Sequence, residues 1–136
     1  MPTAPLNSNK HNEVSGYLAW LLRAEGLAVF IVMLLCYQNI LDTSWKTFFI
    51  LFFIPDISFL GYLVSKKVGA ILYNLMHSYI PPLVIGTIFW HYSLDSFNYI
   101  IVIWIAHIGF DRTLGFGLKY AEGFNYTHLK KIGRNP

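Results

Sequence analysis

Charged residues are scarce in this sequence. They make up 12% of its 136 residues, whereas hydrophobic residues make up 55% and aromatic residues 18%. A chain with so few charges has too little polar surface to cover a water-soluble globule, so the composition predicts a membrane protein. The formal net charge of +3 does not indicate a nucleic-acid-binding protein, because Lys and Arg lie at the edges of apolar runs and form no basic stripe.

Several motifs of soluble enzymes are also missing. The chain has no nucleophile elbow, phosphate-binding loop or dinucleotide fingerprint, so soluble enzyme classes have no support. Its single cysteine, Cys36, cannot form an intrachain disulfide and lies in an apolar run, as is typical of a small buried hydrophobic residue. No small-residue cleavage site follows the first apolar run, so we expect this run to stay in the protein as a helix.

The apolar runs predict an all-α integral membrane protein built as a four-helix bundle. Each run is close to the length of about 20 residues that a helix needs to cross a bilayer. The expected helices cover residues 17–38, 45–64, 68–91 and 97–118. Residues 1–16 should form a mobile polar tail, and residues 119–136, which mix aromatic and basic side chains, should form an amphipathic cytoplasmic tail.

Proline residues predict kinks in two of the four helices. Pro55 has no N–H to donate to the carbonyl of Leu51, so the second helix should bend beside Asp56. In the third helix, the Pro81–Pro82 pair frees carbonyl groups one turn earlier, including that of His77. Both kinks therefore adjoin polar side chains.

The basic residues predict which side of the membrane each loop faces. Lys66 and Lys67 fill the second loop, and other Lys residues precede the first helix and follow the fourth, whereas the third loop contains only Asp95 as a charged residue. Because cytoplasmic loops carry an excess of Lys and Arg, both termini should face the cytoplasm. We therefore expect a multi-pass protein of the cell inner membrane, with the lipid bilayer as its partner. The sequence predicts no oligomeric state.

Ionisable side chains inside these helices form the candidate functional site. With about 1.5 Å of rise per residue, Glu25, Asp56 and Asp111 each lie roughly 12 Å from the cytoplasmic ends of their helices. A charged group at the bilayer centre costs on the order of 2.5 to 3.5 kcal/mol, so these groups should face one another rather than lipid. The candidate catalytic residues are Glu25, Asp56, His77, His107 and Asp111, and the candidate substrate-binding residues are Tyr73, Asn74 and Arg112.

The spacing of His107 and Asp111 gives the sharpest structural expectation. They are four residues apart, so they share one face of a helix. We expect Asp111 to accept a hydrogen bond from one imidazole nitrogen of His107, which would turn the other nitrogen toward His77 and Asp56. Asn74 should hydrogen-bond one of the carboxylates.

Two functional hypotheses follow from this polar layer. In the first, the protein is a membrane-embedded enzyme that donates a proton to a lipophilic small molecule and accepts one from it, in a cyclisation, isomerisation or hydrolysis. In the second, the layer is a proton or ion relay, or only locks the helices of a membrane-complex subunit together. The outer half of the chain is almost entirely apolar, which favours a pocket open to the cytoplasm over a conduction path.

We expect no cofactor. Imidazole and carboxylate groups suit zinc or iron, so a divalent metal ion is the alternative that these residue types leave open. The chain lacks the H-x-x-H and H-E-x-x-H spacings of common metal sites, and the sequence alone therefore predicts no metal ligands.

Five segments of the chain together resemble a known family. They are L-R-A-E-G (22–26), P-D-I-S-F-L-G-Y (55–62), Y-N-L-M-H-S-Y (73–79), A-H-I-G-F-D-R-T-L-G-F-G-L-K-Y (106–120) and T-H-L-K-K-I-G-R (127–134). In this order they resemble a family of small bacterial membrane proteins catalogued as domain of unknown function 4260. The resemblance extends from Leu18 to Arg134 and implies a compact four-helix membrane protein. It implies no activity, substrate or cofactor.

Overall fold

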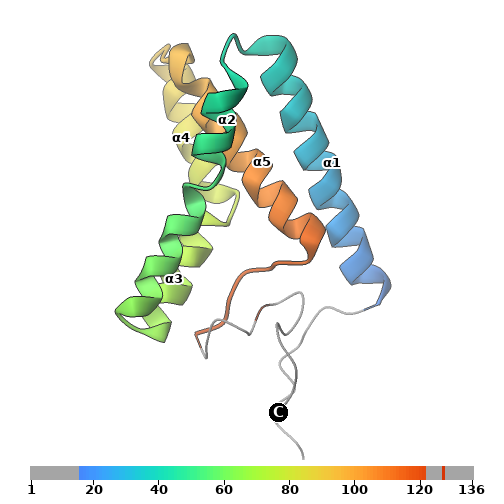
Figure 1. The fold of residues 1–136 in the computed structure, drawn as a ribbon, viewed down its shortest axis with the longest axis vertical. Helices are drawn as coiled ribbons and strands as arrows, with labels where there is room; N and C mark the ends of the chain where they lie inside the picture. The colour runs from blue at the N-terminus through green and yellow to red at the C-terminus, as the bar shows by residue number, and fades with distance from the viewer. Residues whose placement is uncertain (1–15, 122–126, 128–136) are drawn as a thin grey trace, which may run out of the picture.

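A computed structural model describes residues 16–121 and residue 127 of the chain. Figure 1 shows its elements, which are α1 (Tyr17–Ile40), α2 (Trp45–Phe52), the 3₁₀-helix η1 (Pro55–Leu63), α3 (Lys66–Met76), α4 (Ile80–His91), the 3₁₀-helix η2 (Asp95–Phe97) and α5 (Asn98–Leu114). All of these elements are helical, which confirms the predicted all-α helical bundle. The expected tails, residues 1–16 and 119–136, lie largely outside the described residues.

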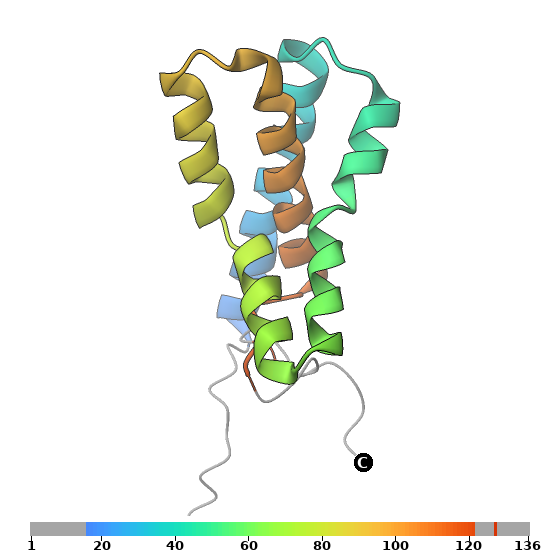
Figure 2. The ribbon, with the colours of Figure 1, turned by 90° about the vertical axis from the view of Figure 1, so that its left-hand side faces the viewer.

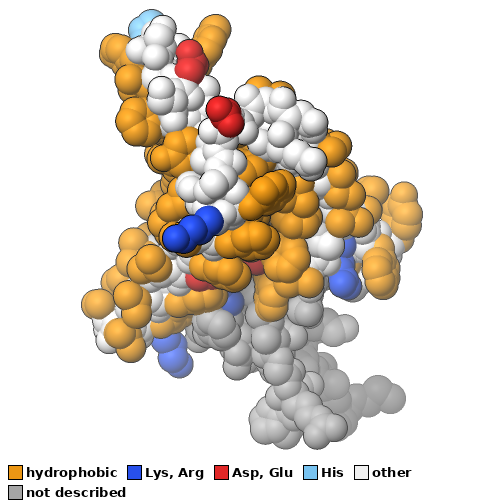
Figure 3. All heavy atoms as spheres, turned by 45° about the horizontal axis from the view of Figure 1, so that its top comes forward, with side chains coloured by type: hydrophobic (Ala, Val, Ile, Leu, Met, Phe, Trp, Pro, Cys, Tyr) orange, Lys and Arg blue, Asp and Glu red, His pale blue; other side chains and the backbone are white. Residues whose placement is uncertain are grey.

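Two segments, and a third if α3 and α4 form one bent span, have the length and composition to cross a membrane. α1, with 24 residues, and the segment Trp45–Leu63, with 19 residues, are each long and apolar enough to cross a membrane. α3 and α4 qualify together as one span bent by 45°. Apolar side chains cover most of the face shown in Figure 3, with few charges between them. The chain therefore has the surface of a protein that contacts lipid.

The chain runs alternately up and down through four segments (Figure 2). These segments are α1, α2 followed by η1, α3 followed by α4, and α5. α5 lies in the middle of the molecule and packs along α1, and it also contacts α2 and α4. η1 and α3 pack against each other at the end of the molecule where α1 begins and α5 ends. This arrangement brings all four segments close to the lower half of α5.

Both proline-containing segments are interrupted rather than smoothly kinked. α2 ends at Phe52 and η1 begins at Pro55, while α3 ends at Met76 and α4 begins at Ile80 with the two prolines in its first turn. Figure 2 shows the two breaks at a similar height, on either side of α5. The broken helix ends therefore place polar backbone and side chains in the interior of the bundle, where α5 can contact them.

Side chains of α5 bind the carbonyl groups that the break between α3 and α4 leaves free. The indole Nε1 of Trp104 donates a hydrogen bond of 2.7 Å to the carbonyl of Met76. Arg112 Nη2 donates one of 2.9 Å to the carbonyl of His77, which is the group that Pro81 cannot serve. Free carbonyls inside a bilayer are costly, so these two bonds allow the break to exist at this depth.

Two glycines allow α1 and α5 to approach closely. A Cβ atom on Gly26 would lie 2.8 Å from the carbonyl oxygen of Gly109, and one on Gly109 would lie 2.9 Å from the carbonyl oxygen of Gly26. Such small-residue crossings bring helix backbones together in membranes, where apolar burial gives little driving force. The crossing fixes the position of α5 at Gly109, two residues from both His107 and Asp111.

α5 ends earlier than expected, at Leu114 rather than at residue 118. Gly115 adopts a left-handed conformation with φ of 86°, and its N–H donates to the carbonyl of Arg112 at 3.0 Å. A glycine in this conformation is a common helix terminator. The chain then leaves the helix and runs to Lys119, beside α3. This early end brings residues into the site that a longer helix would have kept away.

The other half of the bundle has an apolar core. Its buried residues are Tyr37, Phe48, Phe52, Ile103 and Ala106. These residues come from α1, α2 and α5 and fill the space beyond the two breaks with aromatic rings in mutual contact. In the described structure, apolar packing therefore fills the bundle on one side of the two helix breaks.

Candidate functional site

Four ionisable side chains from three chain segments meet beside the breaks. Asp56 lies in the first turn of η1, His77 directly follows α3, and His107 and Asp111 lie on one face of α5. One nitrogen or oxygen atom from each of them lies within 4.8 Å of those of the others. The prediction that these four side chains share one site, with His107 and Asp111 facing the bundle interior, is confirmed. We call this group the His/Asp cluster.

Both imidazole rings of the His/Asp cluster point the same nitrogen toward its centre. The Nε2 atoms of His77 and His107 are 3.1 Å apart. Asp56 Oδ1 lies 3.4 Å from Nε2 of His77 and 3.5 Å from Nε2 of His107. Asp111 Oδ2 lies 3.5 Å and 3.8 Å from the same two atoms. The expected arrangement of His107, with Asp111 on one ring nitrogen and the rest of the site on the other, is therefore wrong. All of these contacts fall on Nε2, and Asp111 at 3.8 Å is too far away for a hydrogen bond.

The position of the proton on His77 follows from its other nitrogen. Nδ1 of His77 lies 2.9 Å from the carbonyl oxygen of Tyr73, which can only accept a hydrogen bond. Nδ1 must therefore carry a proton, and in the neutral ring Nε2 presents its lone pair to the centre of the cluster. The Tyr73 ring stacks on the imidazole, with centroids 3.8 Å apart, and holds it in this orientation.

His107 is fixed by packing rather than by a second hydrogen bond. Its ring is 2% exposed and meets the edge of Phe52, with centroids 5.1 Å apart. Nδ1 of His107 has no hydrogen-bond partner among the residues that the structure describes. Only Nε2 contacts polar groups, so the chemistry available to His107 is directed into the cluster.

The His/Asp cluster needs a positive charge at its centre. A single proton between the two Nε2 atoms fits their 3.1 Å separation, but no carboxylate oxygen comes closer than 3.4 Å to either ring. This distance exceeds the usual range of about 2.7–3.2 Å for a strong hydrogen bond from nitrogen to oxygen. Two carboxylates and the lone pair of His77, all of which are hydrogen-bond acceptors, therefore face one another at distances of 3.4 Å or more. A shared proton or a bound cation would relieve this repulsion.

A cavity of about 240 Å³ adjoins the carboxylates of the cluster. The Asp56 side chain is 35% exposed and that of Asp111 14%, whereas those of His77 and His107 are 1% and 2% exposed. The carboxylates thus face the cavity and the imidazoles lie behind them. The cavity is lined by Asp56, Phe59, Tyr73, Asp111, Phe116 and Lys119.

Lys119 places a cation on the wall of this cavity. Its Nζ lies 4.7 Å from the ring centre of Tyr73 and 5.7 Å from that of Phe59, at cation–π distances. Burial lowers the pKa of the Lys119 ammonium group to about 8, although the carboxylate of Asp111 acts in the opposite direction. The cavity therefore combines carboxylates, aromatic faces and an ammonium group within a small volume.

Two predicted substrate-binding residues, Asn74 and Arg112, make hydrogen bonds to the backbone. Asn74 does not hydrogen-bond a carboxylate, as we expected, but pairs with the backbone of Lys119, donating to its carbonyl at 2.8 Å and accepting from its N–H at 2.6 Å. Arg112 donates to the carbonyls of Phe116 and His77, both at 2.9 Å. Both side chains hold the segment after α5 near the site. Of the three, only Tyr73 lines the cavity at the cluster.

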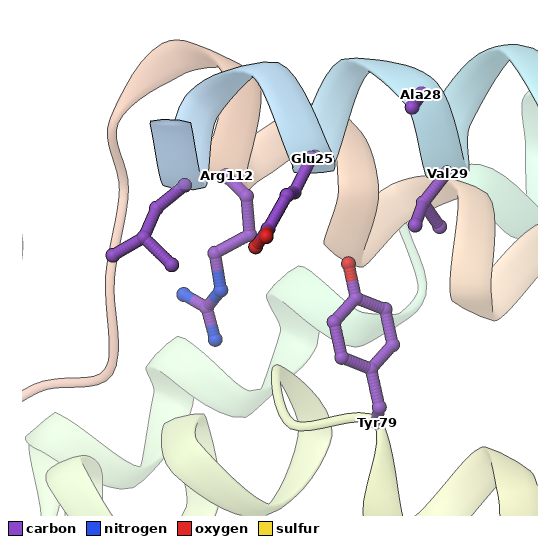
Figure 4. A pocket seen from close by; sticks show the side chains of 7 residues that line it. Glu25, Ala28, Val29, Tyr79 and Arg112 are labelled. Atoms are coloured by element: carbon purple, nitrogen blue, oxygen red, sulfur yellow. The ribbon is translucent and has the colours of Figure 1, made fainter. Parts of the chain in front are cut away.

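Glu25 does not join the His/Asp cluster, and its assignment to the same pocket is wrong. It lines a separate hollow of about 460 Å³ between α1 and the break that follows α3. Figure 4 shows its carboxylate, the guanidinium of Arg112 and the hydroxyl of Tyr79 directed into this hollow. Equal depth in the bilayer did not place Glu25 with the other carboxylates, because it lies on a different side of α5.

Sequence reasoning missed several residues of the site. The sequence gives no signal for a contact of Trp104 in the bundle interior, since tryptophan in membrane helices commonly lies at the lipid interface. Phe116 and Lys119 were placed in or after a continuing helix, although Gly115 and Gly117 carry the signal for an earlier end. The contact between Lys119 and the cavity depends on the turn at Gly115, which a count along a helix cannot reveal.

The residues of the cluster are suitable metal ligands. Imidazole nitrogen and carboxylate oxygen are ligands of zinc and iron(II), and a histidine that binds metal through Nε2 commonly donates its Nδ1 proton to a carbonyl or carboxylate. His77 has this arrangement with the carbonyl of Tyr73. The same geometry also suits the transfer of a proton, because the groups differ in basicity and are in contact.

Comparisons with known proteins add a family but no activity. A family model described as Domain of unknown function (DUF4260) matches residues 19–132, which include the whole His/Asp cluster. Neither the curated proteins nor the solved structures gave a match.

Proposed function

The chain belongs to the DUF4260 family, and we propose that it is a membrane-embedded acid–base enzyme whose catalytic centre is the His/Asp cluster. One observation carries the proposal, namely that both carboxylates of a four-residue cluster with two buried histidines line a cavity of about 240 Å³. Groups that only lock helices together have no need of a cavity beside them. The proposed substrate is a lipophilic small molecule.

The size of the cavity supports an amphiphilic substrate. Pockets that enclose a complete small molecule have volumes of about 300–1,000 Å³, so a cavity of about 240 Å³ fits the reacting polar part of a larger molecule. The aromatic faces of Phe59 and Phe116 would contact its apolar portion, and Lys119 would contact an electronegative group. The remaining apolar chain would lie in the lipid or along the apolar surface of the protein.

The arrangement supports a division of roles within the cluster. Asp56 and Asp111 face the cavity, so they would touch the substrate, one accepting a proton from it and the other returning one. His77 and His107 lie behind and would stabilise the shared proton through their Nε2 atoms. Isomerisation, cyclisation and hydrolysis each require a proton to be removed at one atom and delivered at another, which is the step that such a pair performs.

A proton or ion relay through the bilayer has less support. A relay needs polar groups through the whole thickness of the membrane, whereas the described core beyond the breaks consists of residues such as Phe48, Phe52 and Ile103. The cavity instead extends toward Phe116 and Lys119, which follow the end of α5. We therefore propose that the substrate reaches the cluster from the side of the chain termini. In our proposal this side is the cytoplasmic face of a cell inner membrane.

Comparison of lipid extracts tests the proposal. In a strain of the natural host that lacks the gene, we expect the wild-type protein to change the mass spectrum of extracted lipophilic compounds. Asp56→Asn and Asp111→Asn should abolish this change while the proteins still insert into the membrane, because asparagine keeps the shape but cannot exchange the proton. Asp42→Asn is the matched control, since Asp42 is an exposed carboxylate residue outside the cluster. If the extracts from both cluster variants gave the same mass spectrum as those from the wild type, acid–base catalysis would be contradicted.

A further inference from the structure

We propose that the His/Asp cluster binds a divalent transition-metal ion, with zinc and iron(II) as the best-matched ions. The inference deepens the proposed function and rests on it, because the ion would occupy the centre to which catalysis is assigned. Each carboxylate would bind the ion through one oxygen and keep the other for proton transfer. The expectation of no cofactor came from the spacing of ligands along the sequence. The structure brings the four residues of the cluster together from three separate segments. A short spacing motif cannot describe a site whose residues lie so far apart in the sequence.

The distances within the cluster match those between the ligands of one ion. An ion about 2.0–2.1 Å from each ligand separates neighbouring ligands by about 3.3–3.4 Å in tetrahedral geometry. The five distances between imidazole nitrogens and their cluster partners run from 3.1 to 3.8 Å. Hydrogen bonds would draw the carboxylates of Asp56 and Asp111 closer to the rings than this. The separations therefore fit a shared central cation better than a set of direct hydrogen bonds.

The charges of the ligands also favour a divalent ion. Two carboxylates and two neutral imidazoles carry a total charge of −2 and balance one divalent cation, which gives a neutral centre. A single shared proton would leave a charge of −1 on these four side chains, and the Lys119 ammonium group on the cavity wall would then have to balance it. The nearest guanidinium, that of Arg112, is already engaged with the carbonyls of His77 and Phe116.

The His77 ring has the orientation of a metal ligand, and the His107 ring directs its Nε2 to the same centre. Both Nε2 atoms point to the centre, and the Nδ1 proton of His77 is directed to the carbonyl of Tyr73. The imidazoles are buried behind, and the two carboxylates border the cavity. An ion here would be reached from the cavity and would supply Lewis acidity to a substrate oxygen or to water. Ion binding would also hold η1, the end of α3 and α5 together.

Metal content of the purified full-length protein tests the inference. The protein should be prepared in mild detergent with an affinity tag that contains no histidine, and its zinc, iron and manganese measured by mass spectrometry. We expect about one ion per chain in the wild type. Asp111→Asn and His107→Gln should each lower retention at least about tenfold, while the exposed residue His91 gives the control variant His91→Gln, which should retain the ion.

A second measurement covers variants that fail to fold. Wild-type protein stripped with a chelator should take up Zn²⁺ in competition with a chromophoric chelator, with one strong site per chain, and its thermal unfolding should shift to higher temperature. Absence of a strong site, or equal ion retention in all folded variants, would overturn the inference. If no ion binds but the change in the lipid extracts still depends on Asp56 and Asp111, the metal site is contradicted and acid–base catalysis is supported. Ion binding without any change in the lipid extracts would contradict the proposed enzyme function and support the metal site.

Discussion

His77 connects the interruption of a helix with the chemistry of the site. Its backbone carbonyl, freed by Pro81, accepts from Arg112, and its ring donates to Tyr73 and faces the cluster. The residue can be buried, at 1% exposure, because every polar atom named here has a partner. A single residue, His77, therefore belongs both to the break between α3 and α4 and to the His/Asp cluster.

Lys119 gives a prediction about pH. Its pKa is about 8 in the folded protein against an ordinary value of 10.5, because burial disfavours the charged form. Between these values the unfolded chain binds a proton that the folded chain lacks, so stability should rise with pH from about 8 to about 10.5.

Thermal unfolding in detergent across this pH range measures the effect of Lys119. Lys119→Met should flatten the rise, whereas Lys66→Met, at an exposed position, should keep it. A pH dependence that is the same in wild type and Lys119→Met would show that the Lys119 ammonium group is not desolvated in the folded state.

At the scale of elements, the close crossing of α1 and α5 positions the cluster. α5 carries both His107 and Asp111, and its distance from α1 is set by the contact of Gly26 with Gly109. Side chains of α5 also hold the α3–α4 break through Trp104. A displacement of α5 should therefore alter stability and the site together.

Gly109→Ala tests the role of this crossing. The added Cβ would meet the carbonyl oxygen of Gly26 and the N–H of Phe30, both at 2.9 Å, and backbone cannot move aside as a side chain can. We expect a loss of about 1–3 kcal/mol of stability. Gly86→Ala is the matched control, because its nearest neighbour is a side-chain atom of Ile101 at 3.2 Å. Equal unfolding temperatures for the two variants would argue against a close α1–α5 contact.

The sequence predicted most of the elements but fewer of the contacts between them. Helix periodicity was enough to pair His107 with Asp111, since both lie on one helix. Counting depth from the membrane surface brought Asp56 and Asp111 to the same level, and the structure joins them. The same count failed for Glu25, because depth along a helix says nothing about the side of the bundle that the helix occupies.

Contacts that depend on the end of a helix could not be predicted by counting. Asn74 was expected to bind a carboxylate, yet it pairs with the backbone of Lys119, which reaches α3 only because α5 stops at Leu114. A glycine at position 115 indicated a possible end, but the path of the chain after Gly115 is set by tertiary contacts such as these.

At the scale of the whole molecule, the four segments alternate in direction. α1 begins and α5 ends at the same end of the molecule, and Lys66, at the start of α3, lies at that end as well. The loop around η2 lies at the other end (Figure 2). A bilayer surrounding the apolar surface would therefore place the basic loop and both ends of the described bundle on one side.

Cysteine labelling in intact cells tests the proposed orientation. In a Cys36→Ala background, Lys67→Cys should be inaccessible to a membrane-impermeant thiol reagent added outside, because the basic loop should be cytoplasmic. Ser96→Cys, in the loop at η2, should react and acts as the positive control. Labelling of Lys67→Cys from outside would reverse the orientation and place the cavity on the external face.

The Nε2 atoms of His77 and His107 point to one centre that they share with Asp56 and Asp111. Nitrogen NMR of histidine-labelled protein in lipid bilayers can detect this shared centre, with His77→Gln and His107→Gln to assign the signals. We expect a proton on Nδ1 and none on Nε2 of His77. We also expect Asp111→Asn to shift the Nε2 signals of both rings and to leave the signals of the exposed residue His91 unchanged. A proton on Nε2 of His77, or a response confined to one ring, would contradict a single shared site.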